Sequence, residues 1–480
     1  MWGESNNMNF EAIIGLELHI EMKTKSKMFS SSPVSFGDEP NTNVAAYDLA
    51  FPGTMPVVNK QAVINAIRVC NALHMNIDDE LWFDRKNYFY SDLPKGYQIT
   101  QQRRPIGSNG YLKINTSKGI KRIGIERLHL EEDTCKQVHF DNYTLLDYNR
   151  AGIPLVEIVS EPEIKTGEEA MRFVEKIRSI VSFLNVSNGK MEEGSLRCDV
   201  NISIKPFGSN KFGKKVEIKN LNTLANIQRA IDFEIRRQEQ VLLSGGVVQQ
   251  ETRRFDEARK ETVLMRVKTD VIDYKCFTDP NILPIKLSKE FIEEAITTSP
   301  ELAEAKYQRY KNLGLNDYDC NLLTANKETC EYFDIVVNNG ANPKLAANWI
   351  IVDIQAVLNK KNITINEFTV SPEYLADLIN LIEDGEISNK QARELFIKMQ
   401  ECDGNPRELV KEISTTKLSE KELLDIIKQV LNDNPQSIID YNRGKDRAIG
   451  YLVAQVMKAT NGKANPKLTN ELILKELKVR

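Results

Sequence analysis

Hydrophobic and polar residues along the first half of the chain follow two periods. Alternation with a period of two is typical of a strand with one buried face, and it predicts strands at 12–22, 110–114, 121–125, 155–160, 198–205 and 215–219. A helical period predicts helices at 60–74, 167–184 and 224–243. The loops between them are long and rich in Gly, Pro and Asn, which is where functional sites usually lie.

After about residue 288 the period becomes helical in nearly every segment, with breaks at 339–343 and 371–372. A further unit begins near 403–406, and its helix at 420–431 starts with a capping box of Ser419 and Glu422. We therefore predict an α+β fold. A mainly antiparallel-sheet domain with flanking helices covers residues 1–295, an all-α helical domain covers 296–404, and a small all-α tail domain covers 405–480.

Composition restricts the classes of protein that these elements can form. The chain has 480 residues, of which 28% are charged, and a net charge of −4, so it is not a simple polycation that coats nucleic acid. No apolar run approaches the roughly 20 residues of a membrane span, and the N-terminal residues do not show the basic start and long apolar stretch typical of a signal peptide. We expect a cytoplasmic protein without a membrane partner. The seven cysteines are scattered, which argues against a structural zinc site.

The stretch GLELHIEM places Glu17, His19 and Glu21 in one row of a predicted strand. Carboxylates with one imidazole suit Mg²⁺ or Mn²⁺ better than zinc. The alternative is that Glu17 and His19 are ordinary polar residues on the exposed face of an antiparallel strand. From these two residues alone, that interpretation is favoured over a metal site. Glu157 weakens it, because that carboxylate stands inside the apolar run PLVEIVS, where burial is costly without a partner or a metal.

Three other segments carry candidate binding residues. RLHLEEDT places Glu131 and Glu132 after an apolar strand, and DRKNYFYSDLPKGYQ interleaves basic and aromatic side chains. The latter mixture is typical of nucleotide or RNA-end binding, although a β-hairpin with extended basic side chains explains it equally well. In RCDVNIS, Arg197, Asp199 and Asn201 share a strand face and are suited to a phosphate with its metal. A solvated strand face is at least as simple an explanation.

The stretch GSNKFGKK nearly matches a phosphate-binding loop, but we reject that interpretation. Position 215 is Lys, so the hydroxyl that would hold Mg²⁺ is absent. The motif also requires a strand before it and a helix after it, whereas both flanks alternate as strands. We predict a hairpin turn.

The tail contains a local excess of basic residues. Between residues 441 and 467 the only acidic residue is Asp446, and the basic residues are Arg443, Lys445, Arg447, Lys458, Lys463 and Lys467. This set is suited to contacts with a nucleic-acid backbone. Solubilising surface charge is the alternative explanation.

The chain closely resembles the B subunits of the aspartyl/glutamyl-tRNA(Asn/Gln) amidotransferase. The resemblance runs from about residue 10 to the C-terminus and includes GYLVAQVMKATNGKANP in the tail. It rests on long motifs in the same order: GLELHIE, KMFS, DRKNYFYSDLPKGYQI, RIGIERLHLEED, NRAGIPLVEIVSEPE, KMEEGSLRCDVNIS, EIKNLN and ETRRFDE.

This resemblance implies an ATP-dependent carbon–nitrogen ligase that acts within a heterotrimer. Such enzymes convert Glu-tRNA(Gln), Asp-tRNA(Asn) or both into Gln-tRNA(Gln) and Asn-tRNA(Asn). Their amidase (glutaminase) subunit releases ammonia, and a small third subunit braces the other two. The tRNA is bound by the B subunit, which phosphorylates the side-chain carboxylate with ATP, and ammonia from a tunnel then displaces the phosphate. The first domain would hold ATP, Mg²⁺ and the tRNA 3′ end, and the two helical domains would hold the tRNA body.

The resemblance also implies roles for individual residues. The implied metal ligands are Glu17, His19, Glu132 and Glu157, and Lys86 with Glu132 would lie near the exit of the ammonia tunnel. Arg197, Asp199 and Asn201 would lie on the ATP side. Some relatives carry zinc-binding cysteines where this chain has Ser30, Ser32, Ala45 and Asp48, so we expect no zinc.

Two alternatives stay open at this point. The first is a tRNA-binding or assembly subunit of the same complex without catalytic function. The second is a stand-alone metal-dependent phosphotransferase, which would be active without partner subunits.

Overall fold

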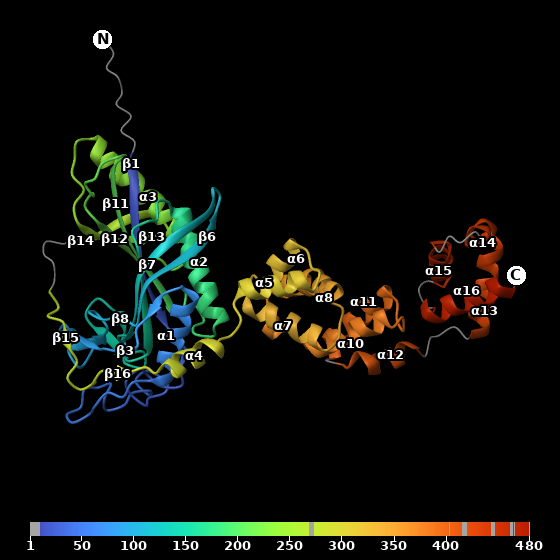
Figure 1. The fold of residues 1–480 in the computed structure, drawn as a ribbon, viewed down its shortest axis with the longest axis horizontal. Helices are drawn as coiled ribbons and strands as arrows, with labels where there is room; N and C mark the ends of the chain where they lie inside the picture. The colour runs from blue at the N-terminus through green and yellow to red at the C-terminus, as the bar shows by residue number, and fades with distance from the viewer. Residues whose placement is uncertain are drawn as a thin grey trace, which may run out of the picture. The chain divides into compact units, whose positions relative to one another are not determined.

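The computed structural model describes residues 10–267, 273–402, 404–414, 420–442, 447–460, 464 and 466–479. It divides into two compact units, Met1–Leu302 and Ala303–Arg480. The first unit contains the strands and the second is helical throughout its described residues (Figure 1). The predicted α+β class with an all-helical second half is confirmed. The further division of the second unit near residue 404 stays a prediction.

A nine-stranded sheet forms the framework of the first unit. Its strands, in spatial order, are β14 (Glu261–Val267), β13 (Glu251–Asp256), β12 (Val216–Lys219), β11 (Leu196–Pro206), β1 (Phe10–Glu21), β10 (Pro154–Ser160), β7 (Gly119–Glu132), β6 (Gly107–Thr116) and β2 (Asn76–Ile77). Neighbours pair antiparallel except β12 and β13, which are parallel. Each predicted strand lies within or overlaps one of these strands. The segment GSNKFGKK connects β11 to β12, as predicted for a hairpin turn.

Three small sheets complete the first unit. One contains β15 (Phe277–Thr278), β4 (Asp84–Asn87) and β5 (Tyr97–Thr100). The second pairs β16 (Ile285–Lys286) with β3 (Glu80–Leu81), and the third pairs β8 (Lys136–His139) with β9 (Thr144–Asp147). Because β4 and β5 pair antiparallel, the segment DRKNYFYSDLPKGYQ forms a hairpin.

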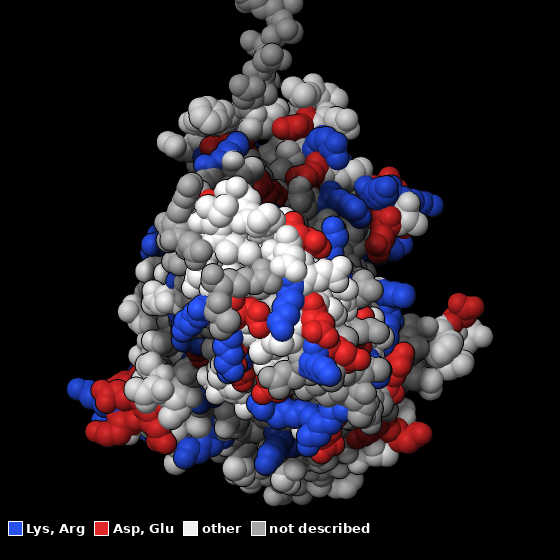
Figure 2. Space-filling view, turned by 90° about the vertical axis from the view of Figure 1, so that its right-hand side faces the viewer, with Lys and Arg blue, Asp and Glu red and all other residues white. Residues whose placement is uncertain are grey.

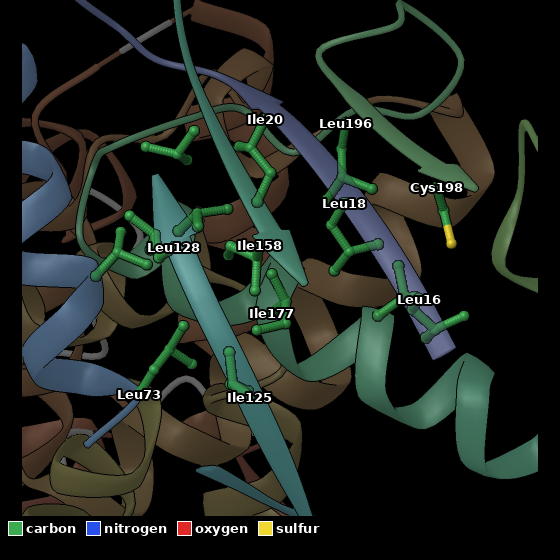
Figure 3. Packing of buried hydrophobic residues seen from close by; sticks show 14 of the residues in the cluster. Leu16, Leu18, Ile20, Leu73, Ile125, Leu128, Ile158, Ile177, Leu196 and Cys198 are labelled. Carbon is green, nitrogen blue, oxygen red and sulfur yellow. The ribbon is translucent and has the colours of Figure 1, made fainter. Parts of the chain in front are cut away.

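Three helices pack against the hydrophobic face of the large sheet. They are α1 (Lys60–Ala72), α2 (Gly167–Phe183) and α3 (Leu224–Leu243), and the side chains of Asn59, Thr166 and Thr223 cap their N-termini. Figure 3 shows Leu18, Ile158 and Leu128 from three adjacent strands together with Ile177 of α2. A fourth helix, α4 (Lys289–Thr297), packs on α1. With one face buried in this way, the polar residues of the central strands must lie on the other face.

The second unit consists of short helices. They are α5 (Ala303–Asn312), α6 (Asp317–Leu323), α7 (Lys327–Asn338), α8 (Pro343–Asn348), the π-helix η1 (Trp349–Ile354), α9 (Gln355–Lys361), the 3₁₀ helix η2 (Ile365–Glu367), α10 (Pro372–Glu383), α11 (Asn389–Cys402), α12 (Pro406–Ser414), α13 (Glu420–Asp433), α14 (Pro435–Asn442), α15 (Arg447–Ala459) and α16 (Pro466–Val479). The predicted breaks are caps, because Asn342 and Ser371 each precede a proline at a helix start. Ser419 of the predicted capping box lies outside the described residues.

The last four helices share a hydrophobic core that includes Ile427, Leu452 and Ile473. Among the described helices of the whole chain, none combines the length and the apolar character that crossing a membrane requires.

Candidate functional site

The face of the large sheet opposite the helices carries a straight row of polar residues. The strand register places His129 opposite Glu157, Glu157 opposite His19, and His19 opposite Arg197. These residues belong to four adjacent strands, and directly opposed residues of antiparallel strands point to the same face. The row therefore brings together side chains from four separate segments, with His19 more than 100 residues before the other three, and no local pattern in the sequence specifies this.

Glu131 completes a cluster around this row. The His19 Nε2 atom lies 3.4 Å from Glu157 Oε2 and 3.8 Å from Glu131 Oε1. One ligand atom from each of these three residues lies within 4.8 Å of the others. His129 Nε2 is 3.1 Å from Glu157 Oε2 and 3.5 Å from Glu131 Oε2. We call His19, His129, Glu131 and Glu157 the histidine–carboxylate cluster. Two carboxylates and an imidazole in reach of one point are a donor set that fits a divalent cation such as Mg²⁺ or Mn²⁺.

The charges of the cluster interact strongly because its members are largely withdrawn from water. Burial disfavours protonation of His129, but the charge of Glu157 and hydrogen bonds to both carboxylates outweigh burial and raise the pKa of His129 to about 9. Burial acts in the same way on His19, and Glu157 again outweighs it and raises the pKa of His19. Burial disfavours the charged form of Glu157, yet the two imidazoles hold its pKa well below the usual range. Nδ1 of His129 is buried, and none of the described residues forms a hydrogen bond with it. The two carboxylates are therefore balanced by the protonated imidazoles in the metal-free chain, and a divalent cation bound between them would take over that role.

Glu17 and Asn201 lie beside this cluster and contact each other. Asn201 Nδ2 donates to Glu17 Oε1 at 2.8 Å. Glu17 lies opposite Asp199 in the β1–β11 pair, and Lys219 Nζ donates to Asp199 Oδ2 at 2.5 Å. Burial lowers the pKa of Lys219, but Asp199 outweighs burial and raises it. Glu17, Asp199 and Asn201 therefore form a second polar group, to which Lys219 contributes a cation.

Arg197 connects the row to a third group of charges. Its Nη2 atom donates to Asp133 Oδ2 at 2.6 Å. Burial favours the protonated form of Asp133, yet Arg197 and Arg150 outweigh it and lower the pKa of Asp133 to about 2. Burial and the adjacent Asp133 raise the pKa of Glu21 to about 8. Glu21, to which the sequence assigned no role, thus lies in this network and is not ordinary exposed surface.

Glu132 and Lys86 lie apart from the histidine–carboxylate cluster. Glu132 follows Glu131 in β7, so its side chain points to the other side of the strand. There Lys95 Nζ donates to both carboxylate oxygens at 2.5 and 2.6 Å, and the Ile99 N–H donates to Oε1 at 3.0 Å. Lys86 Nζ lies over the ring of Tyr274, 4.9 Å from its centroid. Of the four predicted metal ligands, the structure brings His19 and Glu157 together, with Glu17 nearby and Glu132 elsewhere.

Three of the six predicted tRNA-binding residues lie outside the described residues: Arg443, Lys445 and Lys463. Arg447, Lys458 and Lys467 are exposed, at the start of α15, near its end and in the first turn of α16. On the face shown in Figure 2, basic and acidic residues are interleaved. Arg447, Lys458 and Lys467 remain candidates because they are exposed and belong to the local excess of basic residues.

Asp48, one of the four positions for which we expected no zinc, belongs to a buried ion pair. Lys27, with a fully buried side chain, donates from Nζ to Asp48 Oδ2 at 3.2 Å and to the Tyr148 carbonyl at 3.1 Å. Ser32 Oγ donates to the same Asp48 oxygen at 2.9 Å. Lys27 and Ser32 thus satisfy a carboxylate in the core of this loop region.

Sequence reasoning noted the acidic run Glu131, Glu132 and Asp133 but gave no role to Glu131 or Asp133. It singled out neither His129 nor Lys219. The period of two in RLHLEED was the available signal, since it places His129 and Glu131 on one face and Glu132 on the other. The pairing of Lys219 with Asp199 had no such signal, because it depends on the alignment of β11 with β12.

Comparison with known proteins covers nearly the whole chain. A family model described as the GatB/GatE catalytic domain matches residues 12–293, and another described as the GatB domain matches residues 331–477. The curated relatives are named as B subunits of the aspartyl/glutamyl-tRNA(Asn/Gln) amidotransferase. The protein of Geobacillus thermodenitrificans is 49% identical over 476 residues, which is 98% of this chain and 100% of the relative. The proteins of Geobacillus kaustophilus and Bacillus velezensis are each 50% identical, over 98% of this chain and 99% and 100% of the relatives.

The histidine–carboxylate cluster lies in the part of the chain that matches the catalytic-domain model. Identity near one half over almost the full length of both chains leaves no large segment unmatched. This chain belongs to the family of B subunits of the aspartyl/glutamyl-tRNA(Asn/Gln) amidotransferase.

Proposed function

We propose that this chain is the ATP-using and tRNA-binding subunit of a tRNA-dependent amidotransferase, a carbon–nitrogen ligase that acts on Glu-tRNA(Gln), Asp-tRNA(Asn) or both. It works with two partner subunits, a glutaminase and a small third protein. The observation that carries the proposal is the histidine–carboxylate cluster, because ligand atoms of His19, Glu131 and Glu157 lie within 4.8 Å of one another, a donor set suited to Mg²⁺.

The chemistry requires activation of a poor acyl donor. The side-chain carboxylate of the tRNA-bound amino acid attacks the γ-phosphorus of ATP, and ADP leaves with the bond electrons. Ammonia then attacks the carbonyl carbon of the acyl phosphate, inorganic phosphate leaves, and a proton is lost to give the amide. Such phosphoryl transfer depends on positioning and charge neutralisation more than on a protein nucleophile.

The residues near the cluster suit these tasks. His19, Glu131 and Glu157 would hold Mg²⁺, which when bound neutralises charge on the transferring phosphate. Arg197 and Lys219 lie on the neighbouring strands and carry positive charge for the other phosphate oxygens. Asp199 and Asn201 would orient Lys219 and Glu17, respectively, through the hydrogen bonds described above.

The β4–β5 hairpin suits the aminoacylated end of the tRNA. The Arg85 guanidinium lies over the Tyr97 ring at 4.0 Å, and the Phe89 side chain is fully exposed. Aromatic faces next to cations bind unpaired bases. Lys86 of this hairpin and the Glu132–Lys95 pair would line the exit of the ammonia tunnel, where polar groups pass ammonia to the acyl phosphate.

The basic residues of the tail would bind the tRNA body: Arg443, Lys445, Arg447, Lys458, Lys463 and Lys467, of which Arg447, Lys458 and Lys467 are described and exposed. Contacts to phosphates position an RNA without reading its sequence. This role agrees with a domain that carries a local charge excess in a chain whose net charge is −4.

The decisive experiment compares Glu157→Gln with Glu126→Gln in the reconstituted complex. Glu126 is an exposed carboxylate of the same sheet. We expect Glu157→Gln to lower ADP formation that depends on Glu-tRNA(Gln) at least 100-fold and Glu126→Gln to lower it less than twofold. Glutaminase activity of the partner and tRNA binding are the controls for assembly.

Full ADP formation by the Glu157→Gln complex would show that the catalytic centre for phosphorylation lies elsewhere. The chain would then serve tRNA binding or assembly alone. Equal activity of the isolated chain and the complex would favour a stand-alone phosphotransferase.

A further inference from the structure

The β8–β9 hairpin carries its hydrophobic residues on the face turned to solvent. Val138 lies opposite Leu145, and the Phe140 N–H donates to the Tyr143 carbonyl, so the period of two places all four side chains on one face. The Phe140 and Tyr143 rings stack with centroids 4.7 Å apart. The exposed fractions are 40% for Val138, 49% for Phe140, 58% for Tyr143 and 55% for Leu145. We call these four residues the hairpin surface.

The opposite face of the hairpin is the one attached to the protein. Gln137 Nε2 donates to Ser91 Oγ at 3.1 Å, and Leu146 is half-buried. The Asn41 side chain donates to the Leu146 carbonyl at 3.0 Å. The hairpin is thus held by its more polar face. A two-stranded hairpin gains stability by burying an apolar face, and this one leaves its apolar face in water.

A neighbouring loop adds further exposed hydrophobic residues. The backbone N–H of Asn41 donates to Asp147 Oδ1 at 3.1 Å, and that of Asn43 donates to Asn149 Oδ1 at 2.8 Å. These bonds join the loop at 33–58 to the strand β9 and the residues after it. The same loop carries exposed Phe36, Phe51, Met55 and Val57. In Figure 1 the loop, drawn in blue, and β8 lie at the same end of the first unit. Exposed apolar residues gathered on neighbouring segments mark interaction sites more often than single ones.

Charge decides which class of partner this surface fits. The hairpin carries one lysine, Lys136, and two aspartates, Asp141 and Asp147. The adjoining loop adds two more acidic residues, Asp38 and Glu39. RNA binding requires an excess of cations, so this acidic border disfavours tRNA in spite of the aromatic pair. A protein with an apolar patch and a basic border is the complementary partner.

We propose that the hairpin surface is a docking site for another protein of the amidotransferase complex, which contacts it through an apolar patch with basic residues at its edge. This inference rests on the multi-subunit part of the proposed function. It does not depend on the histidine–carboxylate cluster or on ATP. The surface therefore serves assembly, and removing it leaves the chain's own residues for phosphoryl transfer in place.

The test uses the full chain co-expressed with the glutaminase and the small third protein from the same genome. The double variant Phe140→Asp/Leu145→Asp disrupts the hairpin surface. The matched control, Ile120→Asp/Phe207→Asp, adds the same charges at two exposed hydrophobic residues elsewhere in the first unit, one at the start of β7 and one in the turn after β11. We expect the first variant to weaken association with the partner subunits at least tenfold in sedimentation or interferometry. The control should change association less than twofold, and both should unfold at the wild-type temperature, since exposed sites contribute little to stability.

A second measurement covers the case in which the double variant misfolds. The conservative variant Leu145→Cys places a thiol on the hairpin surface. We expect a maleimide probe to label this thiol in the free chain and to label it at least tenfold more slowly in the assembled complex. Equal labelling rates would overturn the proposal.

Each other outcome of the double-variant experiment would contradict the docking site. Wild-type association of Phe140→Asp/Leu145→Asp overturns the proposal, as does an equal loss in the control variant. Normal association with loss of tRNA binding would make the surface an RNA platform, and loss of self-association alone would make it a contact between two copies. The Glu157→Gln experiment reads ADP formation instead, so failure of the docking site and failure of the catalytic assignment are distinguishable.

Discussion

Glu157 of β10 and His19 of β1 lie directly opposite each other, with Glu157 Oε2 3.4 Å from His19 Nε2. Glu157 also lies within hydrogen-bond distance of His129 on the other neighbouring strand. One carboxylate therefore contacts two imidazoles, one on each adjacent strand. This arrangement explains how a charged residue is accommodated inside the apolar run PLVEIVS. It also predicts which changes will separate metal binding, stability and RNA binding.

Adjacent residues Glu131 and Glu132 should have different effects when neutralised. Glu131→Gln removes a member of the histidine–carboxylate cluster, so we expect Mn²⁺ affinity, measured by calorimetry, to fall at least about tenfold. Glu132→Gln leaves the nearly buried Lys95 without its counter-charge. It should lower the free energy of unfolding by about 3 kcal/mol and change Mn²⁺ affinity less than twofold. A loss of Mn²⁺ affinity in Glu132→Gln alone would favour the ligand set that the resemblance implied.

The metal-free chain should become less stable as pH rises from about 6.5 to about 9. His129 has its pKa raised from 6.5 to about 9, so it binds its proton more tightly in the folded state. That contribution is fully present below pH 6.5 and is lost as pH rises through 9, with a total of about 3 kcal/mol. Glu21, with a pKa raised to about 8, acts in the same direction. Chemical denaturation in the presence of a chelator measures the slope.

The variant His129→Gln isolates the contribution of this imidazole. It should flatten the upper part of the pH dependence and leave the part due to Glu21. An unchanged slope between pH 8 and 9 in this variant would mean that His129 is not the group that titrates there.

Removing one partner of the buried Lys27–Asp48 pair should lower the free energy of unfolding more than replacing both partners does. Lys27→Met leaves the Asp48 carboxylate buried without its cation, and we expect the free energy of unfolding to fall by about 3–5 kcal/mol. Lys27→Met/Asp48→Asn removes both charges and should recover at least half of that loss. Urea denaturation followed by fluorescence gives both values. Equal losses in the single and double variants would contradict this account.

Neutralising the exposed basic residues of the tail should weaken tRNA binding in a salt-dependent way. In Arg447→Ala/Lys458→Ala/Lys467→Ala we expect the dissociation constant for tRNA to rise and the slope of log K against log salt to fall in magnitude by about 3, roughly one unit per phosphate contact. The control Lys118→Ala/Lys211→Ala/Lys214→Ala removes the same charge from exposed turns of the first unit. An equal change in the control would attribute the effect to overall charge.

Much of the fold could be predicted from local periodicity. The predicted strand 12–22 is observed as β1, and the predicted helix 224–243 has the same bounds as α3. The central strands bury one face completely, so hydrophobic residues must alternate there without interruption. The very short strands β2, β3, β15 and β16, of two residues each, had no such signal. Their pairing depends on contacts distant in sequence.

The candidate site was only partly predictable for the same reason. Alternation placed Glu17, His19 and Glu21 on one strand face, and the apolar surroundings of Glu157 marked that carboxylate as unusual. The resemblance then selected Glu132 as a ligand, whereas the geometry favours Glu131. Choosing between Glu131 and Glu132 requires the register of β7 against β10, because adjacent residues of a strand point to opposite faces.

By itself, the sequence determined the α+β class, the polar face of β1 and the helical second half, because these follow from spacing within single segments. It also determined family membership through motifs distributed along the chain. Only the tertiary structure decided that His129, Glu157 and His19 form one row, that Lys219 neutralises Asp199, and that the β8–β9 hairpin turns its apolar face outward. Each of these depends on which strands are neighbours and in what alignment. That is set by the burial of the whole sheet against α1, α2 and α3 rather than by any local pattern.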